Sequence, residues 1–237
     1  MKRIVLLAFV AVTATASSAF AGPWSPAAGS QPTFDYSSGS DLNNYFGTPL
    51  TFTNGFNFVP AGMTASAVND SSASVADTTS VIMTAAPNRY FSWISAGFMG
   101  DYSILGNGSV NGIGEVRVRN LDTMQVLTQT LTFTPDMPVG SGFMDESEEE
   151  EGFASASGLF QSNGVIVLPF GWRNVQVELD GLVSAYGGLQ SASLIQGKSG
   201  HINVGTEVIP LPPAVLAAIP VIALAGWARK RMSPRRA

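Results

Sequence analysis

The chain has 237 residues, with hydrophobic residues at 45%, charged residues at 12%, one His and no Cys. That length can bury a core, and the lack of Cys excludes disulfides, iron–sulfur clusters and thiol nucleophiles. All 17 acidic residues lie between Asp35 and Glu207 with only five basic residues among them, which gives this stretch a formal charge of −12. This charge argues against nucleic acid as a partner. A single His makes a multi-histidine metal site impossible, and no cofactor is expected.

Residues 1–21 have the organisation of a secretory signal peptide. A basic start precedes the apolar residues 4–12, and Ala19 and Ala21 provide a small-x-small cleavage site. The export translocon is thus an expected partner, and the mature chain is expected to begin at Gly22. An uncleaved anchor is the alternative, although the apolar stretch is short for a membrane span.

The body of the chain has the composition of a β-protein. Residues 22–47 contain three prolines and many serines, and we expect them to form a loose lead-in. Over residues 48–207, short alternating runs recur between turn signals without a sustained helical period. We expect about nine to twelve strands and an all-β fold, a β-sandwich or jelly-roll-like ectodomain.

Individual strands can be placed by their alternation. Residues 115–119 put two valines on one face and charges on the other, and residues 127–133 alternate with threonines as their antiparallel partner. Residues 175–180 alternate in the same way. Asn54–Gly55 and Asn163–Gly164 each predict the turn of a β-hairpin.

The run Tyr90–Ile94 contains the densest group of aromatic residues. Alternation predicts that Phe91 and Trp93 share one strand face. Trp93 and Trp172 are candidates for stacking against sugar rings, as exposed aromatics in sugar-binding jelly rolls do. The alternative is a central strand buried on both faces, because aromatic residues supply much of a small β core.

Residues 136–156 interrupt the strands with the one acidic run of the chain. Asp145, Glu146, Glu148 and Glu149 are candidates for weak cation binding, because hard cations prefer several carboxylate oxygens. The run lacks the spacing of a dedicated calcium loop, and a solvated acidic loop is the simpler interpretation.

Few residues point to catalysis. Glu178 and Asp180 share a strand face and could flank a glycosidic bond, although the polar face of a strand has the same pattern. His201 is the one candidate for a catalytic base and is more simply a polar residue at the start of a strand. No nucleophile or zinc-hydrolase motif accompanies these residues, so no catalytic residue is assigned and no enzyme is expected.

Residues 208–237 have the features of a membrane segment. A helix over residues 213–228 would be about 24 Å long, somewhat below the roughly 30 Å of a bilayer core. The tail over residues 229–237 would hold the chain end in the cytoplasm. Its first residues are the predicted membrane stop: Arg229, Lys230 and Arg231.

The residues before this helix are Ile209, Pro210, Leu211 and Pro212. A Pro-containing motif, one apolar helix and an Arg-rich tail in this order resemble the PEP-CTERM sorting signal of Gram-negative bacteria, in its Pro-Leu-Pro variant. Leu211 stands where the namesake motif has Glu. The resemblance implies processing by an exosortase-type membrane protease and a link to exopolysaccharide and biofilm, with an ordinary C-terminal anchor as the alternative.

Three functions follow as hypotheses. The first is a non-enzymatic exported surface or matrix protein, held transiently or permanently in the inner membrane and then found at the cell surface or outside the cell. The second is a carbohydrate-binding module that uses exposed aromatics, with polysaccharide as its partner. The third, less favoured, is a secreted hydrolase that uses carboxylates.

The two end segments predict the masses of the processed protein. Intact-mass analysis of protein from the membrane and medium of a host with a matching exosortase should find a released form that begins at Gly22 and ends within residues 209–213. A single membrane-bound species that retains Arg236 and Ala237 would contradict the sorting hypothesis and leave a plain anchor.

Overall fold

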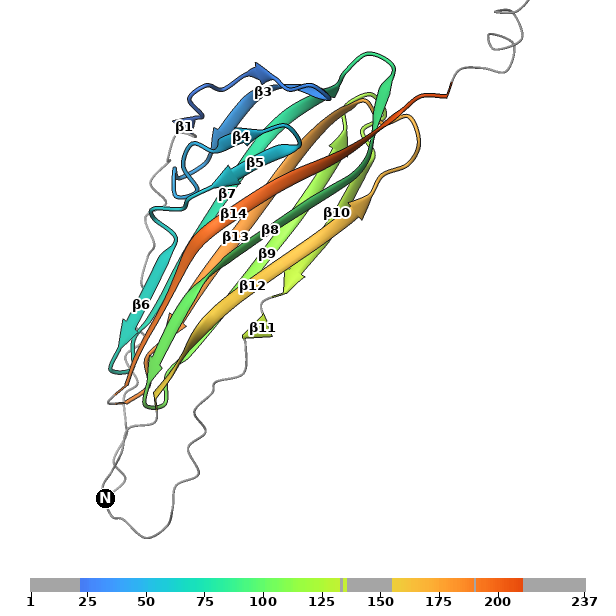
Figure 1. The fold of residues 1–237 in the computed structure, drawn as a ribbon. Coiled ribbons are helices and arrows are strands. Elements are labelled where there is room, and N and C mark those ends of the chain that lie inside the picture. The colour runs from blue at the N-terminus through green and yellow to red at the C-terminus, as the bar shows by residue number, and fades with distance from the viewer. Residues whose placement is uncertain (1–21, 133, 136–154, 190, 211–237) are drawn as a thin grey trace, which may run out of the picture.

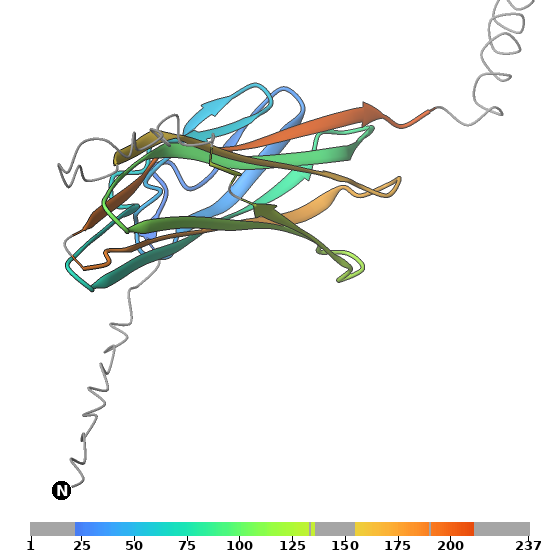
Figure 2. The same cartoon turned by 90° about the horizontal axis from the view of Figure 1, so that it is seen from below.

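The computed structural model describes residues 22–132, 134–135, 155–189 and 191–210. Within these ranges every regular element is a β-strand, and the strands form two antiparallel sheets, A and B, of seven strands each. The two sheets lie face to face as an elongated sandwich (Figures 1 and 2). The prediction of an all-β sandwich is therefore confirmed at this level.

Sheet A has the strand order β1-β3-β7-β13-β9-β10, and β2 also pairs with β3. Its centre is the long antiparallel ladder in which β13 pairs with β7 on one side and with β9 on the other. The strands of sheet A are β1 (Gly22–Pro23), β2 (Gly29–Ser30), β3 (Phe34–Asp41), β7 (Ser72–Ala85), β9 (Ser109–Asn120), β10 (Val126–Thr132) and β13 (Asn174–Tyr186).

Sheet B has the strand order β11-β12-β8-β14-β5-β4, and β6 also pairs with β14. The last strand of the described chain, β14, therefore lies between β8 and β5 (Figure 1). The strands of sheet B are β4 (Leu50–Phe52), β5 (Gly55–Phe58), β6 (Thr64–Val68), β8 (Arg89–Leu105), β11 (Thr134–Pro135), β12 (Ser155–Val167) and β14 (Ala192–Val208).

The core forms because alternate side chains of both sheets point inward. In β13 buried and half-buried residues alternate along nearly the whole strand. The predicted strands over residues 115–119 and 175–180 lie in β9 and β13, and residues 126–132 form β10 beside β9, as the alternation predicted. The largest fully buried side chains are Phe34, Phe46, Phe56, Phe58, Phe91, Phe98 and Phe160.

The N-terminal part of the described chain differs from the prediction. Residues 22–47, expected as a loose lead-in, contain β1, β2 and β3 and send aromatic side chains into the core. Phe56 of sheet B meets three of them, with ring centroids 5.1 Å from Trp24, 5.9 Å from Phe34 and 5.1 Å from Tyr36. The many prolines and serines of this segment gave no sign that its aromatic side chains are buried in the core against Phe56.

One of the two predicted hairpins is present. Strands β4 and β5 form a hairpin at Asn54–Gly55, but Phe52 pairs with Gly55, so Thr53 and Asn54 make the turn. The hairpin predicted at Asn163–Gly164 is wrong, because both residues lie within the unbroken ladder of β12 with β8. Gly164 meets a packing requirement instead, since an added Cβ would lie 2.5 Å from Leu131 Cδ2.

Both predicted end segments fall largely outside the described residues. Ala19, Ala21, the helix over residues 213–228 and the basic tail lie there, as does Leu211. At the described ends, Gly22 pairs with Asp41, and Ile209 donates its backbone N–H to Asn88 at 2.8 Å. In the part of the chain that the structure describes, no helix is long and apolar enough to cross a membrane.

Two buried aspartates join β3 and β7 to the loop that follows β3. Asp77 accepts hydrogen bonds from the backbone N–H groups of Asn43 (2.8 Å), Tyr45 (2.7 Å) and Thr78 (2.8 Å). Asp41 is 1% exposed and has one buried oxygen without a hydrogen-bond partner. Burial, reinforced by the neighbouring Asp77, raises the pKa of Asp41 to about 8 from an ordinary value of 3.8.

This pair predicts a pH-dependent stability. The folded state holds a proton on Asp41 that the unfolded state releases, so the free energy of unfolding should fall as the pH rises from about 4 to about 8. Asp41→Asn keeps a neutral group there and should flatten this slope in urea unfolding curves. Asp70→Asn, at an exposed turn, is the control and should retain the slope; an equal slope in Asp41→Asn would refute the assignment.

Candidate functional site

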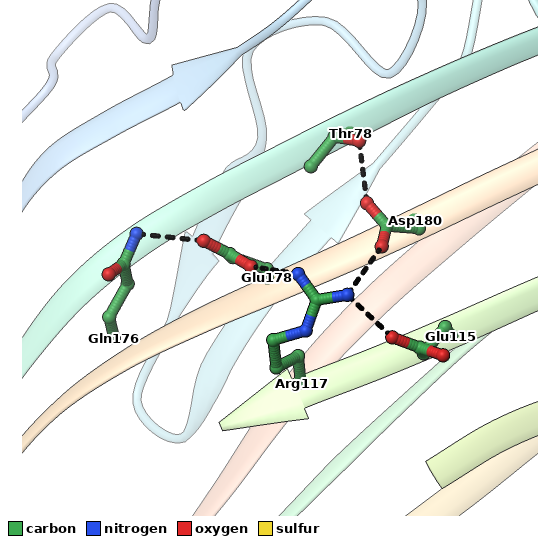
Figure 3. Close-up of polar contacts among 6 residues, drawn as sticks. All are labelled: Thr78, Glu115, Arg117, Gln176, Glu178 and Asp180. Carbon is green, nitrogen blue, oxygen red and sulfur yellow. Dashed lines mark hydrogen bonds and ion pairs between the residues drawn. The ribbon is translucent and has the colours of Figure 1, made fainter. Parts of the chain in front are cut away.

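The two outer faces of the sandwich have different chemistry, and the charges lie mainly on sheet A. Arg117 of β9 contacts Glu115 on its own strand (2.7 Å) and Glu178 on β13 (2.8 Å), with Asp180 at 3.9 Å (Figure 3). Hydrogen bonds from Arg117 to Glu115 and then Glu178 raise its pKa further above its ordinary value. This side chain acts as the cationic centre of a local acidic cluster.

The remaining oxygens of the cluster also have partners. Gln176 donates to Glu178 at 3.0 Å, and the Thr78 hydroxyl donates to Asp180 at 2.5 Å (Figure 3). Glu178 and Asp180, the carboxylates considered for a hydrolase, are therefore both held by hydrogen bonds or ion pairs to side chains on β7, β9 and β13. The arrangement fits a cross-strand structural network on the outside of sheet A.

The outer face of sheet B carries uncharged polar groups together with exposed apolar side chains, among them Trp93, Leu159, Val165 and Val167. We call this surface the amide face and define it by the outward side chains of β12, β8, β14 and β5. The pairing places Asn163, Gly97, His201 and Asn57 in one row across four strands. A neighbouring row contains Val165, Ser95, Asn203 and Gly55, and the next contains Val167, Trp93 and Gly205.

Trp93 lies flat against the backbone of β14. It is 37% exposed, and an added Cβ at Gly205 would overlap its indole at Nε1 and Cε2 and lie 2.5 Å from Cδ1. The absence of a side chain at Gly205 is thus what allows one ring face to rest on the sheet. The other face is available to solvent, which is the geometry of a stacking platform.

Gly97 forms the floor of the amide face one row beyond Ser95. An added Cβ there would overlap Asn163 Oδ1 and would lie 3.0 Å from His201 Cε1. The amide of Asn163 on β12 and the imidazole of His201 on β14 therefore both lie close above Gly97, one from each side. Burial lowers the pKa of His201, so this imidazole is neutral at pH 7.

The polar groups of the amide face have unused hydrogen-bonding capacity. Within the described residues, no side-chain hydrogen bond is made by Asn57, Asn163, His201 or Asn203. An amide both donates and accepts, and a neutral imidazole has one donor and one acceptor. These groups are therefore free to bind a ligand rich in hydroxyls.

Two hollows lie on this face. One, of about 480 Å³, is lined by Met99, Gln161, Asn163 and Lys198 among others. The other, of about 650 Å³, is lined on the opposite side of β14 by residues that include Phe52, Asn57 and Asn203. Asn163 lines the first hollow and Asn203 the second, whereas Trp93 lines neither and lies beside them on β8.

The structure separates the two tryptophans predicted as stacking residues. Trp93 is exposed, but Trp172 is 4% exposed within the core, so the prediction for Trp172 is wrong. Phe91 and Trp93 also lie on opposite faces, because the register between β8 and β14 shifts at Gly205 and Thr206. The candidate cation ligands Asp145, Glu146, Glu148 and Glu149 lie outside the described residues.

Sequence reasoning missed most of the amide face. Asn203 had a usable signal, because Ile202 and Val204 alternate with it. Asn163 was hidden by its assignment to a turn, and the roles of Gly97 and Gly205 depend on cross-strand neighbours that local sequence does not reveal. His201 was singled out as a lone residue rather than as a member of this group.

The packing of Trp93 on Gly205 predicts the effect of one methyl group. Gly205→Ala should displace the indole of Trp93 and raise the fraction of tryptophan fluorescence that acrylamide quenches, because Trp24 and Trp172 are buried and the signal of Trp227 is common to all the variants. Val208→Ala on the same strand is the control. Quenching of Gly205→Ala equal to wild type, with Trp93→Phe as the baseline, would contradict the platform geometry.

Comparison with known proteins finds no matching family model and no matching curated protein. Among solved structures, the chain is similar to TmCBM61 in complex with beta-1,4-galactotriose, at 13% identity and a TM-score of 0.25, covering 73% of this chain and 88% of that one. A second is the enzymatically active domain of bacteriophage CBA120 tailspike protein 4, at 10% identity and a TM-score of 0.18, covering 73% and 18%. Similarities this low carry no argument about ligand or reaction.

Proposed function

We propose that this chain is a non-enzymatic exported protein that binds polysaccharide through the amide face of sheet B. The observation that carries the proposal is the indole of Trp93, fixed over Gly205 beside amide and imidazole groups with unused hydrogen bonds. The apolar face of one sugar ring would stack on the indole, and hydroxyls of the same glycan chain would bind Asn203, Asn163 and His201 along the face.

Export and membrane attachment are part of the same proposal. They rest on the sequence of residues 1–21 and 208–237, which have the order signal, body, span and basic stop. Passage through the translocon, action of an exosortase-type protease and display at the cell surface would place the amide face in contact with exopolysaccharide. A role in the biofilm matrix follows from that location.

Polysaccharide binding is tested by removing the platform. Trp93→Ala in the full-length chain should weaken retention on polysaccharide at least about tenfold, or about 1.4 kcal/mol, through loss of stacking. Retention is measured by affinity electrophoresis or pull-down, with thermal unfolding to confirm the fold. Because the indole also packs on β14, the unfolding midpoint should fall modestly, and retention is compared at a temperature well below both midpoints.

Tyr186→Ala is the matched control. Tyr186 is an aromatic of comparable exposure, 48%, on β13 of sheet A. This variant should bind like wild type. Equal retention of wild type and Trp93→Ala would refute binding through the amide face, and shortening of the glycan during the assay would favour the hydrolase hypothesis instead.

A further inference from the structure

We infer that the ligand of the amide face is an uncharged glycan chain that lies along β8, and this inference rests on the proposed function. Between the rows of Trp93 and Gly97, the outward residues of β12, β8 and β14 include no charged side chain. At the ends of this stretch the charges have partners: Lys198 lies 3.5 Å from Asp101, and Glu207 accepts a hydrogen bond from Tyr90 at 2.6 Å.

Charge therefore argues against an acidic polysaccharide. Carboxylates and sulfates accept hydrogen bonds without donating them and are recognised by Arg and Lys. The one cation on this part of the face, Lys198, already has an acidic neighbour, and the stretch from Asp35 to Glu207 carries −12 overall. An anionic chain would be repelled, whereas a neutral chain would not.

The available hydrogen-bonding groups favour hydroxyls. A sugar hydroxyl donates and accepts at once, as do the amides of Asn163 and Asn203. His201 is neutral at pH 7 because burial lowers its pKa, and it offers a donor and an acceptor of its own. The hydrogen-bonding groups of the amide face therefore complement an uncharged ligand that is rich in hydroxyls.

The shape of the face gives the direction of the chain. Gly97 is buried at the floor, whereas the outward residues of the neighbouring β12 stand high, with Val165 55% and Leu159 66% exposed. The outward residues of β8, which are Trp93, Ser95, Gly97 and Met99, therefore form one row beside β12. Hollows continue along β8 beyond Gly97, past Met99 and Asp101 to Ser103.

The two contact points are too far apart for one sugar ring. Trp93 and Gly97 are four residues apart on β8, which is about 13 Å along a strand. A monosaccharide that stacks on Trp93 cannot also reach the amide of Asn163 over Gly97. Occupation of both points requires an oligosaccharide.

The test compares ligand charge and ligand length. Full-length protein is titrated calorimetrically with uncharged oligosaccharides of one to six rings and with oligouronates and sulfated oligosaccharides of matched length. An uncharged series should contain a hexasaccharide that binds at least about tenfold more tightly than its monosaccharide. Its affinity should change less than twofold between about 0.1 M and 1 M salt, over which the Debye length falls from about 10 Å to 3 Å.

Variants locate the chain on β8. Gly97→Ala should push the Asn163 amide and the His201 imidazole aside and weaken the hexasaccharide without affecting any binding of the monosaccharide to Trp93. Asn163→Ala, at an exposed position, serves the same purpose if Gly97→Ala does not fold. Val208→Ala is the control and should bind like wild type.

Each result separates this inference from the proposed function. Tighter, salt-sensitive binding of an acidic oligosaccharide would overturn the uncharged ligand and leave polysaccharide binding standing. Equal affinity for monosaccharide and hexasaccharide, or wild-type binding by both Gly97→Ala and Asn163→Ala, would overturn the path along β8. Absence of binding to every glycan by folded protein would overturn the inference and the proposed function together.

Discussion

The face-to-face packing of two antiparallel sheets is the constraint on which the rest of this molecule depends. Each strand must turn alternate side chains inward, and the aromatic cluster around Phe56 shows how tightly the two sheets meet. The other half of the side chains is then left outside, where packing does not determine it. On sheet A those side chains satisfy one another around Arg117, whereas on sheet B Lys198 pairs with Asp101 but Asn163, His201 and Asn203 make no side-chain hydrogen bond within the described residues. The proposal of a binding face on sheet B starts from this difference.

Period-two alternation made much of the sandwich predictable from sequence. It located β9, β10 and β13, because buried residues alternate with polar ones over residues 115–119 and 175–180, and Leu131 lies between two threonines. It failed where the ladder is irregular: the register shift beside Gly205 puts Phe91 inside and Trp93 outside, although the two are two residues apart. Trp172 precedes β13 outside any strand, so no period could assign its burial.

Long-range packing accounts for the remaining differences. The first strands were missed because proline and serine dominate residues 22–47, and only contact with Phe56 reveals why the aromatics are there. Gly164 resembled a turn residue but is required by Leu131 of another strand. Trp93 and His201 were therefore visible in the sequence as candidate residues, but their arrangement with Asn163 and Asn203 was not, since that arrangement depends on which strands become neighbours.

The position of β14 also constrains when the protein can fold. This strand is the last in the described chain, yet it is the partner of β8, β5 and β6, so sheet B has no centre until residues 192–208 are present. A chain synthesised from its N-terminus must leave β8 and the β4–β5 hairpin without that partner for most of its synthesis, and such long-range pairing is slow. Completion of sheet B therefore waits for residues 192–208, and a chain that stops before them is expected to leave the sandwich open along β8 and β5.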